Sequence, residues 1–263
     1  MVIELRWIIK LFCKDITVFE NMPQTIYKYS GKSDIGPERN VNQDSFRIAE
    51  LDWGSLFLVS DGFGHEKGGL FASRSSVDIF IDEFLEEPPK DIKKFLLNTF
   101  RKINKHIYYH KVSEFNKAML GCTTVAMIFQ NNLAHIAHVG DSRGYLIRKN
   151  SLIQLTKDHS YIQTLIDKGK VAPEEALLNP KRHVLSKALG SRKNPTPGYK
   201  SIEIESDDKF ILCSDGVWGY MSDDVILNII NKNVVSTAVT KVIDHIKKSD
   251  GLDNITLQVI HFK

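Results

Sequence analysis

The sequence has few cysteines, and none of them is placed for a disulfide framework. Cys13, Cys122 and Cys213 lie in apolar surroundings without a CxxC spacing. Cysteines of this kind indicate buried thiols in a reducing compartment, and they exclude a cysteine-rich zinc site. We therefore expect a cytoplasmic protein whose core is not held by covalent cross-links.

Long apolar runs are also missing. Nothing in the chain approaches the roughly 18 uninterrupted apolar residues of a membrane-spanning helix. At the N-terminus, charged residues interrupt the apolar ones, which argues against a secretory signal. The apolar residues there that fit one face of a short helix are Val2, Leu5, Ile8, Ile9 and Phe12. We expect residues 1–24 to be an appended segment that packs on the protein body or on a partner, and not on a membrane.

A strong charge of one sign is absent as well. The net charge of +3 comes from 35 basic and 32 acidic residues, without a Lys/Arg-rich block. This balance argues against nucleic-acid binding. The 263 residues, of which 42% are hydrophobic and 25% charged, suffice for a real core and are typical of a soluble globular protein.

What the chain does contain is a repeated pattern in which an apolar run ends in an acid. Leu56–Gly62 and Phe210–Gly216 both close with Ser-Asp-Gly, and Ile136–Asp141 closes with Gly-Asp. Apolar runs of this length, bounded by turn residues, predict strands buried on both faces. The pattern therefore places Asp61 and Asp215 at rigid strand ends, where a neighbouring glycine lets the backbone approach a ligand.

Carboxylates gathered at strand ends repel one another unless a hard cation lies between them. We therefore hypothesise a metal site with oxygen ligands at these strand ends. The alternative is that each Asp-Gly is an ordinary turn, because this dipeptide is a very common turn signal. One copy alone favours the turn, and the second Ser-Asp-Gly copy strengthens the metal hypothesis.

The rest of the chain predicts antiparallel strands and separate helices. Strands are expected over residues 25–30, 45–49, 55–60, 122–130, 133–139, 144–148, 152–155, 199–204, 209–213 and 255–261, and helices over 70–85, 91–112, 161–168, 222–230 and 234–246. A weak pattern from Gly169 to Pro197 predicts an irregular flap over one end of the sheet. Strands in hairpins with segregated helices indicate an α+β layered sandwich. On the helix over 91–112, His106 and His110 have the spacing of a metal pair, but no third zinc ligand is evident, so we expect solvent-side histidines.

Eight short motifs occur in a fixed order along the chain. They are Arg39-x-x-Asn42-Gln43-Asp44, Ser60-Asp61-Gly62-Phe63-Gly64, Gly121-Cys122-Thr123-Thr124, His138-Val139-Gly140-Asp141-Ser142-Arg143, Leu155-Thr156-Lys157-Asp158-His159-Ser160, Lys187-Ala188-Leu189-Gly190, Cys213-Ser214-Asp215-Gly216 and Asp253-Asn254-Ile255-Thr256. In this order they resemble the metal-dependent serine/threonine protein phosphatases of type 2C, the PPM family, from about Tyr27 to Ile260. The compact bacterial type is the more similar.

The resemblance implies a four-layer α-β-β-α sandwich of two antiparallel sheets flanked by helices. It implies a catalytic domain over residues 25–263, with a small flap over about residues 161–197. It also implies two Mn²⁺ or Mg²⁺ ions, with a third, weaker one in bacterial members. The ligands that the resemblance implies are Asp44, Asp61, Gly62, Asp141, Asp215 and Asp253.

The resemblance gives these residues different roles. Asp61 would bridge the two ions, helped on one of them by the Gly62 carbonyl. Asp215 and Asp253 would complete the other site, and Asp44 would be a direct or water-mediated ligand. Asp61 and Asp215 are thus the residues expected to carry catalysis. With Asp215, a further acid, Asp141, would hold the third metal, while Arg39 would clamp the substrate phosphate.

The residue types fit this chemistry without the family. Carboxylate and carbonyl oxygens suit Mg²⁺ or Mn²⁺, whereas zinc prefers His and Cys. Two such ions about 4 Å apart acidify a bridging water, and the resulting hydroxide attacks phosphorus without a protein nucleophile. An arginine remains charged and matches a phosphate bidentately. Each of these residues also has a structural alternative. Arg39 could be a surface ion-pair partner, and Asp141 could cap the turn after its strand. Asp253-Asn254 could form an Asx turn.

The chain also departs from its relatives at some positions. Many eukaryotic members place a histidine, a candidate general acid, at the position of Phe63, which cannot donate a proton. The leaving oxygen would then take its proton from metal-bound water or from His65, for which an inert surface role is an equal alternative. His159 is expected to orient backbone near a helix start. Leu70 stands where relatives often have glutamate, and Lys187 replaces a frequent arginine.

We therefore expect a monomeric phosphatase that acts on phosphoserine and phosphothreonine of proteins phosphorylated by a cognate kinase. Two alternatives use the same fold. A pseudophosphatase would serve as a binding module, but every expected acid is present here. A hydrolase of small phosphate esters is harder to separate, because an open site bordered by a flap has no distinguishing sequence signal.

Overall fold

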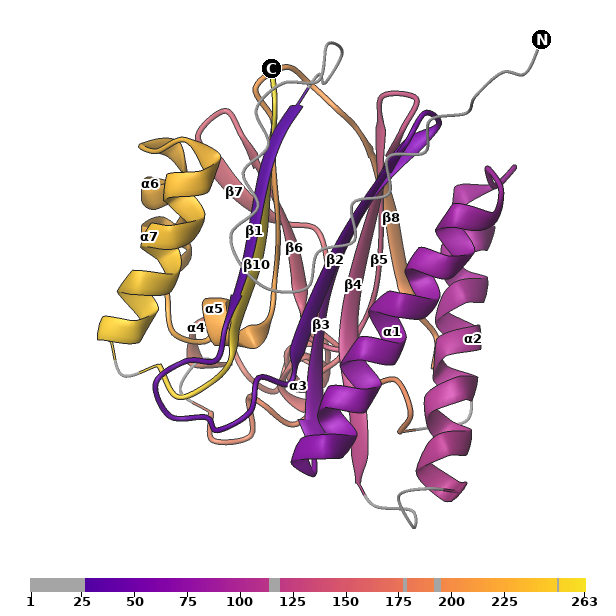
Figure 1. Cartoon of the computed structure of the whole chain (residues 1–263). Helices are drawn as coiled ribbons and strands as arrows, with labels where there is room; N and C mark the ends of the chain where they lie inside the picture. The colour runs from indigo at the N-terminus through magenta and orange to yellow at the C-terminus, as the bar shows by residue number, and fades with distance from the viewer. Residues whose placement is uncertain (1–26, 114–118, 177–178, 192–194, 250) are drawn as a thin grey trace, which may run out of the picture.

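The chain folds into two five-stranded antiparallel sheets packed face to face, with helices on both outer faces (Figure 1). The computed structural model describes residues 27–113, 119–176, 179–191, 195–249 and 251–263. One sheet has the order β1-β10-β9-β6-β7 and the other β2-β3-β4-β5-β8. The strands are β1 (Tyr27–Asp34), β2 (Asp44–Leu51), β3 (Gly54–Gly64), β4 (Leu120–Gln130), β5 (Leu133–Val139), β6 (Arg143–Arg148), β7 (Ser151–Gln154), β8 (Gly198–Glu203), β9 (Lys209–Cys213) and β10 (Ile255–Phe262). The predicted α+β sandwich is confirmed.

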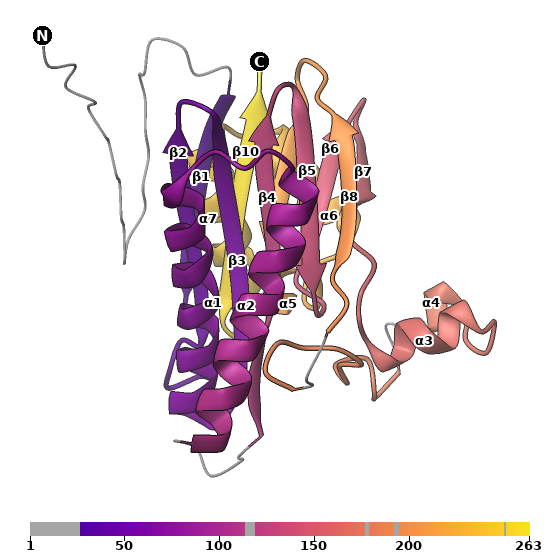
Figure 2. The same cartoon turned by 90° about the vertical axis from the view of Figure 1, so that its right-hand side faces the viewer.

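Two pairs of long helices cover the outer faces of the sandwich, and the short ones lie at one end. The helices are α1 (Glu66–Glu86), α2 (Ile92–Ser113), α3 (Tyr161–Asp167), α4 (Pro173–Ala176), α5 (Asp215–Trp218), α6 (Asp223–Asn231) and α7 (Val235–Lys248). In Figure 1, α1 and α2 flank the sheet that contains β3, and α6 and α7 flank the one that contains β10. Figure 2 shows α3 and α4 standing apart from the sandwich, in the stretch predicted as the flap.

Side-chain alternation in β3 explains how the layers hold together. Leu56 and Leu58 point into the core beneath α1 and α2, while Phe57 and Val59 point into the core between the two sheets. All four side chains are fully buried. Because successive residues of a strand face opposite sides, one apolar run serves two cores. The prediction of a strand buried on both faces is therefore confirmed.

Several element boundaries differ from those predicted. β3 does not end at Ser60, as predicted, but continues to Gly64, so Asp61 lies inside the strand, opposite Asp44 of β2 and Thr123 of β4. Pairing with β4 continues beyond the apolar run as far as Gly64 opposite Leu120. Hydrogen bonds between the two strands, and not hydrophobic residues, therefore extend β3 there. α1 begins at Glu66 rather than Leu70, in a stretch that its glycines made look like a turn.

Two further expectations concern the N-terminal segment and membrane-spanning helices. The proposed N-terminal helix face, residues 1–12, lies outside the described residues, and the division at residue 24 stays a prediction. Within the described ranges, no helix is both long enough and apolar enough to cross a membrane.

Candidate metal centre

Five aspartates from separate segments gather at one end of the sandwich. Asp44 opens β2 opposite Asp61 of β3, and Asp141 follows the end of β5. Asp215 begins α5 directly after β9, and Asp253 precedes β10. The other four all act electrostatically on the Asp61 carboxyl. The structure thus brings together the five acids that the sequence singled out.

Two glycines allow these segments to approach one another. A Cβ on Gly62 would lie 2.1 Å from the Gly69 carbonyl oxygen and 2.8 Å from that of Gln43. A Cβ on Gly216 would lie 1.9 Å from the Asn254 carbonyl oxygen. No side chain fits at such separations, so glycine after each aspartate is a packing requirement. The Ser-Asp-Gly pattern is therefore more than a turn signal at both sites.

The pKa values of Asp44, Asp61 and Asp141 are raised, as expected for buried acids of like charge that lie close together. Burial raises the pKa of the Asp44 carboxyl to about 7; hydrogen bonds from Thr256 and Ser214 oppose this shift, and the charges of Asp215 and Asp253 add to it. Burial and the neighbouring acids also raise the pKa of Asp61 well above its usual value. The same causes, burial first, raise the pKa of Asp141. A cation would relieve this repulsion, because it stabilises the charged form of every acid around it.

The donor set suits a hard cation that keeps part of its water shell. Among the described residues, no three Asp, Glu, His or Cys side chains form a closed set of metal ligands. The five acids are near enough to act on one another but do not converge on one point. Backbone carbonyls and water would have to complete any coordination, as is usual for Mg²⁺ and Mn²⁺. The residues therefore fit these ions and do not fit a tetrahedral zinc site.

Hydrogen bonds fix the orientation of Asp44, a contribution that the sequence did not reveal. The Ser214 hydroxyl donates to Asp44 Oδ2 at 2.8 Å, and the Thr256 backbone N–H donates to the Ser214 oxygen at 3.1 Å. These two hydrogen bonds link β2 of one sheet with β10 and the end of β9 in the other. Ser214 and Thr256 stand in the recognised motifs, but nothing in their spacing shows that they contact an acid on the other sheet.

Arg39 reaches the centre from an exposed loop. Its Nη2 donates to Asp253 Oδ2 at 3.0 Å, and its side chain is 49% exposed. Asn254 holds this loop in place: it accepts from the Gln43 backbone N–H at 2.9 Å and donates to the Val41 carbonyl at 3.2 Å. Arg39 therefore forms an ion pair, as the alternative expected, but its partner is one of the five acids.

One histidine at the centre was not expected from the sequence. His183 Nδ1 lies 3.5 Å from Asp215 Oδ2, and its side chain is 43% exposed. It comes from the irregular stretch between α4 and β8, where no periodic pattern marks a residue as inward-facing. No sequence signal would have found it.

The backbone around Asp141 is held by hydrogen bonds from and to aromatic side chains. Trp218 Nε1 donates to the Asp141 carbonyl at 3.0 Å, and the Arg143 guanidinium lies 3.7 Å from the centre of the Trp218 ring. His159 Nδ1 accepts from the Gly140 backbone N–H at 3.2 Å. The side chain of His159 thus orients backbone as expected, but at Gly140 after β5 and not near a helix start. Burial lowers the pKa of His159 to about 3, so its imidazole is neutral and suited to accept that bond.

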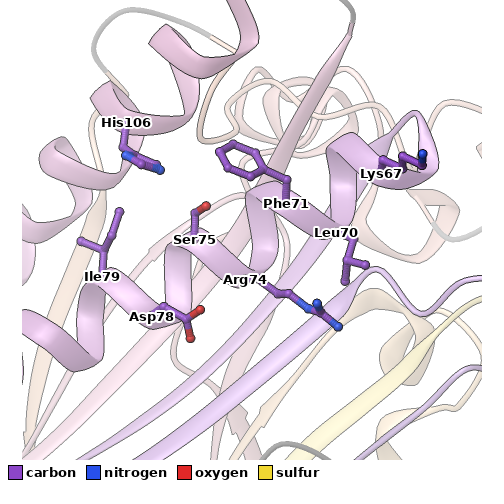
Figure 3. A pocket seen from close by; sticks show the side chains of 8 residues that line it. All are labelled: Lys67, Leu70, Phe71, Arg74, Ser75, Asp78, Ile79 and His106. Carbon is purple, nitrogen blue, oxygen red and sulfur yellow. The ribbon is translucent and has the colours of Figure 1, made fainter. Parts of the chain in front are cut away.

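Other candidates lie away from the acids. The rings of His106 and His110 lie tilted against each other with centres 4.2 Å apart, and no third ligand joins them among the described residues. Leu70 and His106 help to line a shallow groove of about 470 Å³ over α1 and α2 (Figure 3). None of the five aspartates lines this groove, so it is not the candidate centre. His65 is exposed at the start of α1, and its possible role as a proton donor stays a prediction.

The raised pKa of Asp44 predicts how stability depends on pH without metal. The folded-state value of about 7 exceeds the ordinary value of 3.8, so the folded protein binds this proton more tightly than the unfolded chain. Raising the pH from about 4 to about 7 therefore lowers the stability that Asp44 contributes. We expect wild type, in EDTA, to lose melting temperature relative to Asp44→Asn over this range. A difference between the two melting temperatures that does not change with pH would contradict the shift.

Comparisons with known proteins agree with this geometry. A sequence model of the family described as Protein phosphatase 2C matches residues 31–250. The serine/threonine protein phosphatase PstP of Mycobacterium tuberculosis is 32% identical over 235 residues, which is 89% of this chain and 45% of PstP. The serine/threonine phosphatase stp of Listeria monocytogenes is 30% identical over 235 residues, 87% of this chain and 93% of stp.

A solved structure resembles the fold as well. The crystal structure of the PstP catalytic domain in complex with 2 manganese ions has a TM-score of 0.79 at 31% identity, over 89% of this chain and 97% of that one. The chain thus spans about half the length of the mycobacterial relatives that it matches and nearly all of the Listeria relative.

Proposed function

Because the chain belongs to the protein phosphatase 2C family, we propose that it removes phosphate from phosphoserine and phosphothreonine of proteins. The observation that supports this most is the cluster of Asp44, Asp61, Asp141, Asp215 and Asp253 beside an exposed arginine. The family depends on Mn²⁺ or Mg²⁺, and the oxygen donors of this cluster suit those ions. The substrate would be the product of a cognate serine/threonine kinase, and the enzyme would act as a monomer.

Each residue of the cluster has a proposed task. Asp61, on whose carboxyl the other four acids act, would hold both ions, with the Gly62 carbonyl on one of them. Asp215 and Asp253 would hold the second ion, with Asp44 as a direct or water-mediated ligand. Asp141, together with Asp215, would hold a weaker third ion. When bound, the ions supply the acidity that turns water into the attacking hydroxide and offset the charge of the phosphate.

The substrate phosphate would be held by Arg39. Its guanidinium lies at the rim of the centre, half exposed, so an incoming phosphate can reach it. A planar guanidinium offers two parallel N–H donors to the phosphate oxygens and keeps its charge at any physiological pH. Asn254 keeps the loop of Arg39 close to Asp253, which fixes the distance between the bound phosphate and the acids.

No protein nucleophile is needed, and the two described thiols are unsuited to the task. Burial raises the pKa of Cys122 to about 11 and raises that of Cys213 as well. Both are fully buried, and a thiol attacks phosphorus only as the thiolate. This supports attack by water and disfavours a cysteine-dependent phosphatase. The leaving oxygen would take its proton from solvent or from His65, because Phe63 has none to give.

Hydrolysis of a phosphothreonine peptide tests the proposal. Purified protein is assayed with Mn²⁺ and with excess EDTA, and we expect turnover with Mn²⁺ that the chelator abolishes and added Mn²⁺ restores. Folded, Mn²⁺-loaded protein that binds the peptide without hydrolysing it would identify a pseudophosphatase. Hydrolysis of metabolite phosphates but of no phosphopeptide would identify a hydrolase of small phosphate esters.

A further inference from the structure

Two large apolar side chains are exposed directly beside the candidate metal centre. Ile35 is 39% exposed and lies in the loop between β1 and β2, which also carries Arg39. Leu252 is 55% exposed and is the residue before Asp253. Single exposed apolar residues are common on protein surfaces, whereas several together beside a site indicate a binding surface. The question is therefore whether Ile35 and Leu252 lie together as one surface or are two separate exposed residues.

The two segments that carry these residues are in contact. A Cβ on Gly36 would lie 2.1 Å from the Asp253 carbonyl oxygen, so the backbones meet there. Asn254 Nδ2 donates to the Ile35 carbonyl at 2.8 Å. In Figure 1 the indigo loop after β1 runs beside the yellow segment before β10, at the end of the sandwich where the acids gather. The two residues thus belong to one continuous rim, and Arg39 pairs with Asp253 on that same rim.

We propose that Ile35 and Leu252 form an apolar docking rim, which binds an aliphatic or aromatic side chain close to the phosphorylated serine or threonine of a protein substrate. This rests on the proposed phosphatase function and adds the class of substrate. The rim is apolar, but Arg39 and Asp253 beside it are charged. An apolar contact next to a charged group suits a ligand that carries an apolar side chain beside a phosphate, because each part then meets a partner of its own kind.

The distances along a peptide agree with this placement. Successive residues of an extended peptide advance by about 3.4 Å, so a residue two positions away lies about 7 Å from the phosphorylated one. Leu252 precedes Asp253, one Cα step of about 3.8 Å away. When Arg39 holds the phosphate, a side chain one or two residues away is therefore within reach of the rim. A small phosphate ester would not reach it.

Two phosphothreonine peptides test the docking rim. They differ only in the two residues on each side of the phosphothreonine, which are leucine in one and glutamine in the other. We expect Mn²⁺-loaded wild type to hydrolyse the leucine peptide with a kcat/KM about tenfold higher, the scale of burying one aliphatic side chain. In the double variant Ile35→Ser/Leu252→Ser this ratio should fall to about one.

Control variants separate the rim from general effects. Val234→Ser removes an apolar side chain that is even more exposed, at 71%, at the N-cap of α7 and should keep the preference. Leu252→Met keeps an apolar side chain and should keep it too. Circular dichroism melting checks that each variant is folded.

Several results would overturn the docking rim. Wild type that hydrolyses both peptides equally well would remove it, and a preference that survives in the folded double variant would place recognition elsewhere. A wild-type dimer that the double variant abolishes, without any peptide preference, would assign the patch to self-association. If wild type hydrolyses neither peptide, the phosphatase proposal itself fails, and the docking rim fails with it.

Discussion

Asp215→Asn is expected to lower the turnover of a phosphothreonine peptide about 1000-fold or more, because it removes a negative charge that would bind and neutralise the cations. Asparagine has nearly the same shape, so the start of α5 and its packing should remain. The folded protein should also lose little stability without metal. The Asp215 carboxylate raises the pKa of Asp61, Asp44 and Asp141, and its removal relieves that repulsion.

The measurement is kcat at saturating Mn²⁺ and peptide, together with the melting temperature in EDTA. Asp224→Asn is a matched control, because Asp224 is an exposed acid in the first turn of the next helix, α6. We expect the control to retain wild-type turnover. If Asp215→Asn kept a turnover number within about twofold of wild type, the assigned site would be wrong.

The arrangement of the fold could be predicted because hydrophobic patterning determines most of it. The run Leu56–Val59 is apolar throughout, which predicts its burial on both faces, and the apolar stripe of α2 is buried except at Phe95, which is partly buried. Such patterns follow from the geometry of strands and helices and need no knowledge of distant contacts. Where the pattern is weak, as around α4, only the absence of regular order could be predicted.

The boundaries near the site were the least predictable part. The sequence places Asp61 after its strand, whereas the ladder from Gly64 opposite Leu120 keeps it inside β3. Likewise, Gly68 and Gly69 suggest a turn but lie in the first turns of α1, where Gly69 packs against Gly62. In both places, contacts between distant segments override local propensity.

The acids of the site were predictable, but their support was not. Asp61 and Asp215 stand out because a charge directly after an apolar run is unusual. By contrast, Ser214 bonding Asp44 across the two sheets, and His183 approaching Asp215, depend on contacts between residues far apart in the chain. A hydroxyl or imidazole carries no periodic signal, so only the folded arrangement reveals these contacts.

Arg39→Ala is expected to lower kcat/KM for a phosphothreonine peptide about 100-fold, because the variant loses a charged, two-pronged phosphate donor. Arg39→Lys should recover only part of this loss, since lysine keeps the charge without the planar pair of donors. Stability should hardly change, because an ion pair as exposed as Arg39 with Asp253 contributes at most about 1 kcal/mol. A large kinetic effect with an unchanged melting temperature would therefore come from the substrate and not from the fold.

The comparison that decides between the two roles of Arg39 uses Arg101→Ala as its control. Arg101 is an exposed arginine on α2, where its Nη1 donates to Asn98 Oδ1 at 2.7 Å, and this helix carries none of the five aspartates. If Arg39 were only a surface ion-pair partner, both variants would retain wild-type kcat/KM. If Arg39 clamps the phosphate, only its own variants lose activity, and inorganic phosphate should inhibit them less strongly than wild type because the product is held by the same guanidinium.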